Sequence, residues 1–176
     1  MKIDQGATNK ELSDIDFPTY ISCFKGLIHY RMLTTKPRDH SMEILVFQGP
    51  TGTGKSHYCA TNYPNAYWKQ RGPWWDNYEN EETVIIDEFY GWLPYDTLLR
   101  LCDKYPLLVE IKGGQLQFTS KRIIITTNAI PNAWYKDVYW PAFERRVSEW
   151  HIFPTWGMHV FYTTFAEAIP HMITNI

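Results

Sequence analysis

The sequence predicts an α/β fold in which a mostly parallel sheet is covered by helices on both faces. Three apolar runs of strand length, at residues 42–48, 83–88 and 121–128, alternate with segments of helical character. Runs of this kind are typical of strands that are buried on both faces of a sheet. A glycine-rich loop follows the first run and polar residues end the other two, as at the ligand-binding edge of such sheets.

The composition bounds the class of protein. The chain has 176 residues, of which 44% are hydrophobic, and this is enough for one well-buried domain. No apolar run approaches the roughly 20 residues needed to span a bilayer, and the first residues are polar, so we expect a soluble, intracellular protein with no membrane partner. Because the net charge is -2 and residues 147–176 contain no Lys or Arg, any nucleic-acid contact must rest on a few positioned residues.

The segment before the first strand, residues 1–40, is expected to consist of a flexible lead of about 15 residues and a helical part. Apolar residues recur at near-helical spacing from Phe17 to Leu33, which predicts one or two amphipathic helices. A polar linker, TTKPRDHS, leads to the sheet. The three cysteines form no metal-ligand pattern, and we expect all of them to be reduced core residues: Cys23, Cys59 and Cys102.

A phosphate-binding loop is the strongest functional signal. The residues after the first strand fit the pattern G-x-x-x-x-G-K-[ST] and precede a plausible helix: Gly49, Pro50, Thr51, Gly52, Thr53, Gly54, Lys55 and Ser56. Small residues let the backbone aim its N–H groups at phosphates, and the helix adds its positive end. We expect Lys55 to reach the β- and γ-phosphates of ATP and the Ser56 hydroxyl to coordinate Mg²⁺.

Two further strands end in residues that suit ATP hydrolysis. Asp87 and Glu88 follow the second apolar run, where Asp87 suits a magnesium ligand and Glu88 a group that polarises the attacking water. An acidic cap on a turn is the plainer interpretation of this pair. Asn128 ends the third run and is expected to orient water or sense the γ-phosphate, although asparagine at a strand end is often only a turn former.

A hairpin is predicted between the second and third runs. The segment 106–118 contains two short alternating strands joined at Gly113-Gly114, with Lys112 at the tip. Copies of such a hairpin around a pore would give single-stranded DNA a set of lysine contacts, whereas a solvated lysine is the plainer alternative.

The aromatic segment 67–78 has two interpretations as well, because Trp74 or Trp75 can stack bases or pack on the core. Trp92 and Trp134 are expected to be packing residues.

In their order, the motifs GPTGTGKS, VIIDEFYGW, VEIKGGQLQF and IIITTN resemble the superfamily 3 helicase domain of replication-associated (Rep) proteins from small circular single-stranded DNA viruses. The stretch 74–135 looks specifically like circoviruses and cycloviruses, and the resemblance covers roughly residues 16–150. The resemblance implies an AAA+ type P-loop ATPase with a helical oligomerisation segment before it. It also implies a homo-hexameric ring that unwinds DNA in the 3′-to-5′ direction during rolling-circle replication in the host nucleus.

The same resemblance assigns roles to individual residues. Lys55 and Ser56 would belong to Walker A, Asp87 and Glu88 to Walker B, and Asn128 to motif C, and Lys112 would contact DNA. Family proteins also carry an arginine that reaches the neighbouring subunit's γ-phosphate. The matching segment is FERRV at residues 143–147, in which Arg146 is the favoured candidate and Arg145 the second. Without the resemblance, both arginines would be interpreted as the solvated end of a helix.

The sequence departs from a complete Rep protein in two ways. Its six histidines form no H-x-H pair, so no nicking activity is expected, and Asp87-Glu88 stands where circovirus relatives often show Asp-Asp. We expect an ATPase core at residues 41–153 and a tail of open role at residues 154–176. The alternatives are an ATP-binding assembly module without turnover, a small-molecule kinase, and a superfamily 3 ATPase that moves along RNA.

Overall fold

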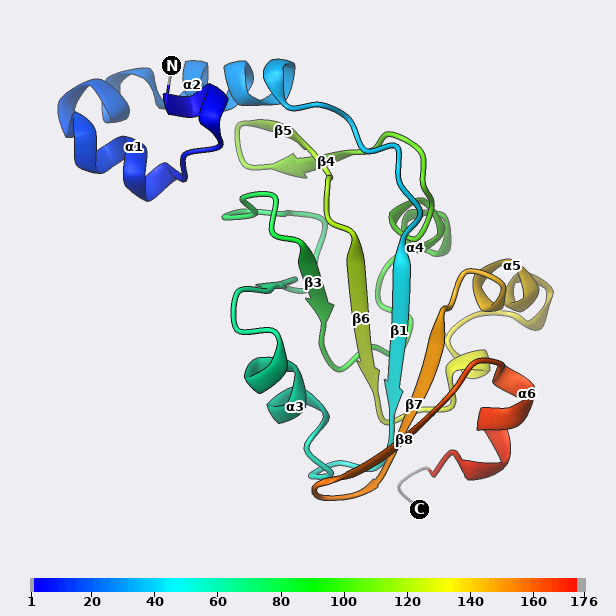
Figure 1. Ribbon diagram of the computed structural model, residues 1–176. Helices are drawn as coiled ribbons and strands as arrows, with labels where there is room; N and C mark the ends of the chain where they lie inside the picture. The colour runs from blue at the N-terminus through cyan, green and yellow to red at the C-terminus, as the bar shows by residue number, and fades with distance from the viewer. Residues whose placement is uncertain (1, 174–176) are drawn as a thin grey trace.

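The computed structural model describes residues 2–173 and has a six-stranded sheet at its centre (Figure 1). The strands lie in the order β2 (Tyr67–Trp68), β3 (Thr83–Ile86), β6 (Arg122–Thr127), β1 (Glu43–Gln48), β7 (Glu149–Thr155) and β8 (Met158–Tyr162). All neighbours are parallel except β7 and β8, which form an antiparallel pair. The predicted mostly parallel sheet is confirmed, and the three apolar runs are β1, β3 and β6.

Helices cover both faces of this sheet: α3 (Lys55–Asn62) lies on one face, and α4 (Tyr95–Leu101), α5 (Trp140–Glu144) and α6 (Phe165–Ala168) lie on the other. The first two helices, α1 (Asn9–Ile15) and α2 (Phe17–Thr34), lie beyond the end of the sheet, beside the hairpin of residues 108–117 (Figure 1). Short 3₁₀ turns are η1 (Lys2–Gln5), η2 (Pro131–Ala133), η3 (Asp137–Tyr139) and η4 (Ile169–His171). Along β1, Leu45 and Phe47 share a buried cluster with Cys59 of α3, whereas Ile44 and Val46 belong to the cluster that contains residues of α4, α5 and α6. This alternation follows from the two-residue period of a strand.

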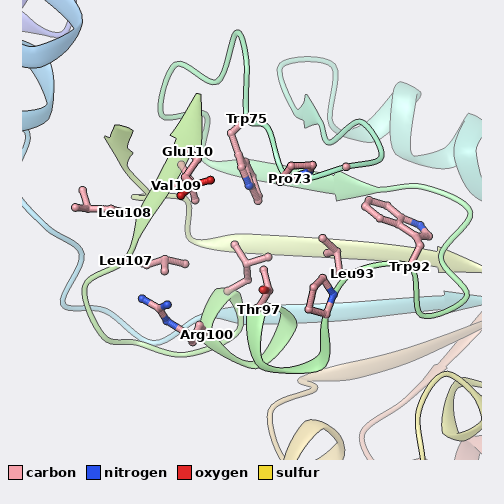
Figure 2. Close-up of a pocket in the computed structure, with 13 residues that line it drawn as sticks. Pro73, Trp75, Trp92, Leu93, Thr97, Arg100, Leu107, Leu108, Val109 and Glu110 are labelled. Carbon is pink, nitrogen blue, oxygen red and sulfur yellow. The ribbon is translucent and has the colours of Figure 1, made fainter. Parts of the chain in front are cut away.

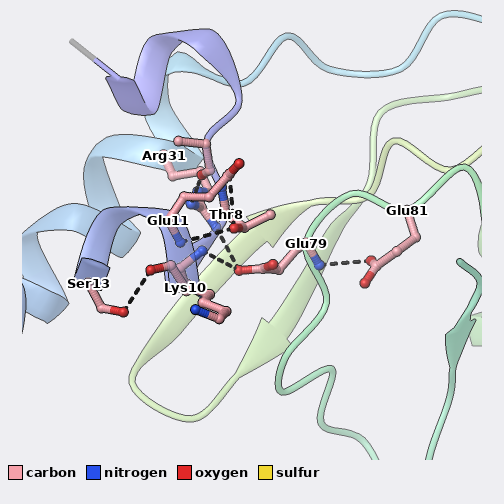
Figure 3. Close-up of polar contacts among 9 residues, drawn as sticks. Thr8, Lys10, Glu11, Ser13, Arg31, Glu79 and Glu81 are labelled. Atoms are coloured by element: carbon pink, nitrogen blue, oxygen red, sulfur yellow. Dashed lines mark hydrogen bonds and ion pairs between the residues drawn. The ribbon is translucent and has the colours of Figure 1, made fainter. Parts of the chain in front are cut away.

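The amino-terminal segment differs from the expected flexible lead. Residues 9–15 form α1, which begins with a capping box in which Thr8 Oγ1 accepts from the N–H of Glu11 and the Glu11 carboxylate accepts from the N–H of Thr8. The Asn9 N–H also donates to Glu79. The Arg31 guanidinium lies 3.8 Å from the Glu79 carboxylate (Figure 3). These contacts attach α1 and α2 to the loop before β3.

Of the one or two helices predicted from Phe17 to Leu33, the structure has one, α2. Ile28 is its buried residue, and its Cγ2 would lie 3.1 Å from a methyl group built on Gly114. Phe17, Ile21 and Leu33 are exposed. The helix therefore packs against the neighbouring hairpin by a narrow contact and leaves much of its apolar surface open.

The hairpin consists of β4 (Leu108–Ile111) and β5 (Gly114–Gln117), which pair antiparallel as a separate two-stranded sheet. Its turn residues are Lys112 and Gly113, one position earlier than the predicted Gly113-Gly114, because Gly114 already pairs with Ile111. Gly113 has φ +94°, a conformation that glycine adopts without strain.

The carboxyl-terminal segment continues the sheet. β7 ends at Thr155, so the expected boundary at residue 153 falls inside a strand, and β8 forms the edge beyond it. Cys59 and Cys102 are buried and free, as expected, whereas the free Cys23 is exposed on α2, which the sequence interpretation did not foresee. Within residues 2–173, no helix combines the length and apolar character that a membrane crossing requires.

Candidate active site

The phosphate-binding loop lies between β1 and α3 at the carboxyl edge of the sheet (Figure 1). Gly49 is required by a close approach, because a methyl group there would lie 2.2 Å from the carbonyl oxygen of Phe153 on β7. Gly54 has φ +90° and immediately precedes the first residue of α3. The loop can therefore wrap tightly enough to point its N–H groups at an anion in front of the helix.

Lys55 is folded back onto this loop. Its ammonium donates to the carbonyl oxygens of Gly49, at 2.7 Å, and Pro50, at 2.8 Å. Burial lowers the pKa of Lys55, and the negative charges of Asp87 and Glu88 oppose this shift. An incoming phosphate can replace the two carbonyl oxygens as the partner of the ammonium.

A shared carboxylate oxygen joins the phosphate loop to the neighbouring strands. The hydroxyl of Ser56 donates to Oδ1 of Asp87 at 2.7 Å, and the hydroxyl of Thr126 donates to the same oxygen at 2.6 Å. Thr126 Oγ1 also accepts from the N–H of Glu88 at 2.9 Å. Thr126 was not among the predicted site residues, although its place two residues before Asn128 in β6 puts it at the ligand-binding edge.

Glu88 leaves the strand in an unusual conformation. Its φ is +48°, which lies in the left-handed region that non-glycine residues rarely adopt. The side chain is exposed, and its Oε2 lies 3.8 Å from the guanidinium of Arg71, which also lies over the ring of Tyr90. The backbone therefore turns the carboxylate away from the sheet and toward the solvent side of the loop.

Predicted residues that follow three different strands line one cavity. This hollow of about 200 Å³ is lined by Lys55, Ser56, Glu88 and Asn128, and also by Thr126, which was not predicted. The remaining walls are Thr51, Gly52, Gly54, His57 and Trp156. Two oxygen donors of the kind Mg²⁺ prefers, the Ser56 hydroxyl and the Asp87 carboxylate, already lie within hydrogen-bond distance of each other. The donor set fits a magnesium ion that also binds phosphate oxygens, although residues 2–173 contain no cluster of three His, Cys, Asp or Glu side chains that could hold a metal alone.

Lys112 lies away from this cavity, at the tip of the β4–β5 hairpin. Its side chain is exposed, with Nζ 3.7 Å from Oδ2 of Asp76, and its N–H donates to Oδ1 of Asp76 at 2.8 Å. The turn that presents the lysine is thus fastened to the loop before β3. The carboxylate reduces the positive charge that the tip offers.

The tryptophans of the aromatic segment have different surroundings. Trp75 is buried and stacks on Tyr67, whereas Trp74 is 44% exposed, so only Trp74 is open to an unpaired base. Trp92 and Trp134 both pack on Phe89, which confirms that they are packing residues. Figure 2 shows Trp75 and Trp92 lining a mostly apolar hollow of about 420 Å³ between α4 and the hairpin.

The two candidate finger arginines lie at the opposite end of the sheet. Arg145 is exposed, whereas the Arg146 side chain is 16% exposed and donates to Oδ2 of Asp103 at 2.8 Å. Both precede β7, which runs parallel to β1, and β1 ends at the phosphate loop. Since a six-residue strand is about 20 Å long, neither arginine is placed to reach the phosphate loop of its own chain.

Comparisons with known proteins agree with this geometry. A family model described as RNA helicase matches residues 45–129. The chain is 48% identical over 124 residues to the replication-associated protein of Beak and feather disease virus, covering 69% of this chain and 43% of that protein. For the replication-associated protein of Porcine circovirus 1 the identity is 44% over 151 residues, covering 80% and 48%, and for that of Human associated cyclovirus 1 it is 43% over 155 residues, covering 80% and 55%.

These matches cover the part of the chain that carries the candidate site. The chain spans about half the length of the curated relatives that it matches. The family model begins in β1 and ends just after Asn128, so it contains the phosphate loop, the acidic pair and the hairpin. Together with the mostly parallel sheet and the order of the motifs, this shows that the chain contains a superfamily 3 helicase domain of the type found in circovirus replication-associated proteins.

Proposed function

We propose that this chain is the ATP-driven motor of a viral rolling-circle replication initiator, which unwinds DNA in the 3′-to-5′ direction as a homo-hexameric ring in the host nucleus. The observation that carries the proposal is the joint hydrogen bonding of Ser56 and Thr126 to Asp87. It couples the phosphate loop to the acidic strand beside a cavity that Glu88 and Asn128 also line. A site that only stores nucleotide needs the phosphate loop but does not need Asp87, Glu88 and Asn128 beside it.

Each residue has a defined task in the proposed reaction. Lys55 exchanges the carbonyl oxygens of Gly49 and Pro50 for phosphate oxygens and holds the β- and γ-phosphates. Ser56 and Asp87 would hold magnesium, which when bound neutralises charge on the β- and γ-phosphates. Glu88 accepts a hydrogen bond from the attacking water.

Asn128 and Thr126 complete the proposed hydrolytic site. The Asn128 amide donates to the γ-phosphate or to the attacking water, on the side of the cavity that Glu88 lines. Thr126 holds the backbone of Glu88 and the carboxylate of Asp87 in their relative positions. The site therefore has groups for the phosphates, for the metal and for the water.

In the proposed ring, a neighbouring subunit supplies a positively charged arginine to the γ-phosphate. Arg146, favoured by the family resemblance, lies at the sheet end opposite the phosphate loop, so it acts on the nucleotide of the next subunit. Its pairing with Asp103 must then be exchanged for the γ-phosphate on assembly. The exposed Arg145 is the second candidate for this role.

DNA contact is proposed for the hairpin. Lys112 projects from its tip in a chain whose net charge is -2, so a ring of such tips can bind phosphates without a basic surface. The matching family model is described as RNA helicase, and this favours movement along RNA as the second candidate function. The two candidate functions share the ATPase site and differ in whether single-stranded DNA or single-stranded RNA stimulates ATP hydrolysis.

The test is magnesium-dependent phosphate release from ATP over a series of protein concentrations, with single-stranded DNA, single-stranded RNA or neither. A specific rate that rises with concentration and with DNA supports the motor with a shared site. Stimulation by RNA alone supports the second candidate. Binding of ATP without phosphate release by the wild type would overturn the proposal in favour of an assembly module, with Lys55→Ala as the control that should lose nucleotide binding.

A further inference from the structure

The tip of the β7–β8 hairpin lies over the phosphate loop. Its turn contains Trp156 and Gly157, directly after β7. A methyl group built on Gly54 would lie 3.1 Å from Cε3 of Trp156, and the Trp156 ring lies over His57 with 5.1 Å between centroids and 32° between planes. Trp156 is nevertheless 64% exposed, so most of its ring surface is open. Packing alone does not account for a tryptophan in this position.

Two hollows meet at this tryptophan. Gly54, His57 and Trp156 line both the cavity with Glu88 and Asn128 and a second one of about 370 Å³. The other walls of the second hollow are Thr53, Tyr58, Thr61, Asn62, Phe153, Gly157 and His159. The two hollows are therefore adjacent, and Trp156 is a wall of both.

The proposed hydrolysis fixes the direction in which a nucleotide lies. Glu88 and Asn128 must face the γ-phosphate, because the bond that breaks is at that end of the triphosphate. The base is attached at the other end, through the ribose and the α-phosphate. It therefore lies farther from Glu88 and Asn128 than the γ-phosphate does, and the adjacent second hollow is lined by neither of these residues.

The second hollow also has the chemistry of a base site. Its walls include the rings of Tyr58, Phe153 and His159, and polar groups are supplied by Thr61 and Asn62. The Phe153 and His159 rings stack on each other at 5.0 Å with 15° between planes, so this wall is aromatic. A purine offers two flat faces and a polar edge, and this combination suits such a hollow.

We propose that Trp156 binds the purine base of the nucleotide by stacking on it in the second hollow. The β7–β8 hairpin, whose role the sequence left open, is then part of the ATP site. This inference rests on the proposed function, because it takes the position of the base from the position of the γ-phosphate. It adds a residue that recognises the nucleoside rather than the phosphates.

The test compares ATP with inorganic tripolyphosphate, which has the phosphates and lacks the base. Binding of each to the full chain is measured by titration calorimetry with Mg²⁺, for wild type, Trp156→Ala, Trp156→Phe and Trp68→Ala. Since a stacked base contributes about 1–3 kcal/mol, Trp156→Ala should weaken ATP binding about 5- to 150-fold and leave tripolyphosphate binding unchanged. Trp156→Phe should recover most of the affinity. Trp68, exposed on β2 at the opposite sheet edge, is the matched control and should bind both ligands as the wild type does.

The outcomes separate the base site from the phosphate site. Equal loss of ATP and tripolyphosphate binding in Trp156→Ala would overturn the inference, because the tryptophan would then support the phosphate loop and not the base. Wild-type affinity for ATP in Trp156→Ala would overturn it as well. Failure of the wild type to bind either ligand would instead contradict the proposed function, and Lys55→Ala, which should lose both ligands, marks that case.

Discussion

Arg146 donates a hydrogen bond of 2.8 Å to Oδ2 of Asp103, although 43 residues separate them in the sequence. Arg146 also donates to the carbonyl oxygen of Ala142. The hydrogen bond from Arg146 to Asp103 keeps the pKa of the Asp103 carboxyl below its ordinary value. Asp103 follows α4, whereas Arg146 follows α5, so the pair ties together two helices on the same face of the sheet. An arginine that acts on a neighbouring subunit must first leave this partner.

We predict that Arg146→Ala keeps nucleotide binding and lowers ATP turnover in the assembled ring about 10³-fold or more, as loss of an arginine finger does. The same change removes the ion pair, which we expect to cost about 1 kcal/mol of unfolding free energy. Turnover at saturating protein concentration, together with urea unfolding, measures both effects.

Asp103→Asn is the control for the ion pair, because it weakens the same contact and leaves the arginine in place. This variant should lose similar stability and retain turnover. Normal turnover in Arg146→Ala, combined with its loss in Arg145→Ala, would move the finger to the exposed neighbour.

Glu88→Gln tests the group proposed to polarise water. The amide keeps the size of the side chain and cannot accept the proton, so ATP binding should remain while turnover falls about 10²- to 10⁴-fold. Binding is measured by calorimetry and turnover by phosphate release. Turnover within a factor of two of wild type would show that another group activates the water.

Thr126→Val tests the residue that holds the acidic pair. Valine fills the same space, and it removes both the donor to Asp87 and the acceptor for the N–H of Glu88. We expect turnover to fall about 10- to 100-fold, by analogy with the loss of groups that orient a catalytic or metal-binding side chain. Thr83→Val is the matched control, because Thr83 is a buried strand threonine at the amino end of β3, and it should retain turnover. Equal losses in the two variants would attribute the effect to general destabilisation.

The sequence predicted the central strands well and the contacts between distant segments poorly. β1, β3 and β6 are long apolar runs because both faces of each are covered, and that pattern is visible without tertiary information. The helix α1 had a visible signal as well, since Thr8 and Glu11 have the spacing of a capping box, but its mostly polar sequence favoured the expectation of a flexible lead.

Other features depend on strand pairing and could not be found from local patterns. Thr126 looks like an ordinary strand residue, and its role follows only from the parallel pairing that sets it beside the end of β3. The turn at Lys112 was misplaced by one residue, because two adjacent glycines both suit a tight turn and only the pairing of Gly114 with Ile111 decides between them. The position of Trp156 over Gly54 likewise requires β7 to lie beside β1.

Lys112→Ala tests the hairpin as the DNA contact. Basal ATPase should be unchanged, whereas stimulation by single-stranded DNA and unwinding should be lost. If each subunit contributes one phosphate contact, the slope of log affinity against log salt should fall by about 0.7 for every contact removed. Lys36→Ala is the control, because Lys36 is an exposed lysine that also faces a carboxylate, that of Asp39 at 3.4 Å. DNA stimulation equal to wild type in Lys112→Ala would leave the lysine as an ordinary surface residue.

Lys69 provides a test through pH. Its side chain is buried, with Nζ donating to the carbonyl oxygens of Gln70 and Gly72 and lying over the rings of Trp75 and Trp92. Burial lowers the pKa of Lys69 from its ordinary value of 10.5 to about 8. Between about pH 8 and pH 10.5, Lys69 is protonated in the unfolded chain and has released its proton in the folded chain. The free energy of unfolding therefore rises with pH in this window.

The measurement is urea unfolding of wild type and Lys69→Met at several pH values, because methionine keeps the length of the stem and has no proton to lose. The unfolding free energy of the wild type relative to the variant should increase by about 2 kcal/mol between pH 7.5 and 9.5. Tyr67, whose pKa burial raises to about 12, acts in the opposite direction because the unfolded chain loses that proton first. It is present in both proteins, so its contribution largely cancels in the difference. Parallel curves for the two proteins would mean that Lys69 stays protonated throughout, held by the carbonyl oxygens and the two tryptophan rings despite its burial.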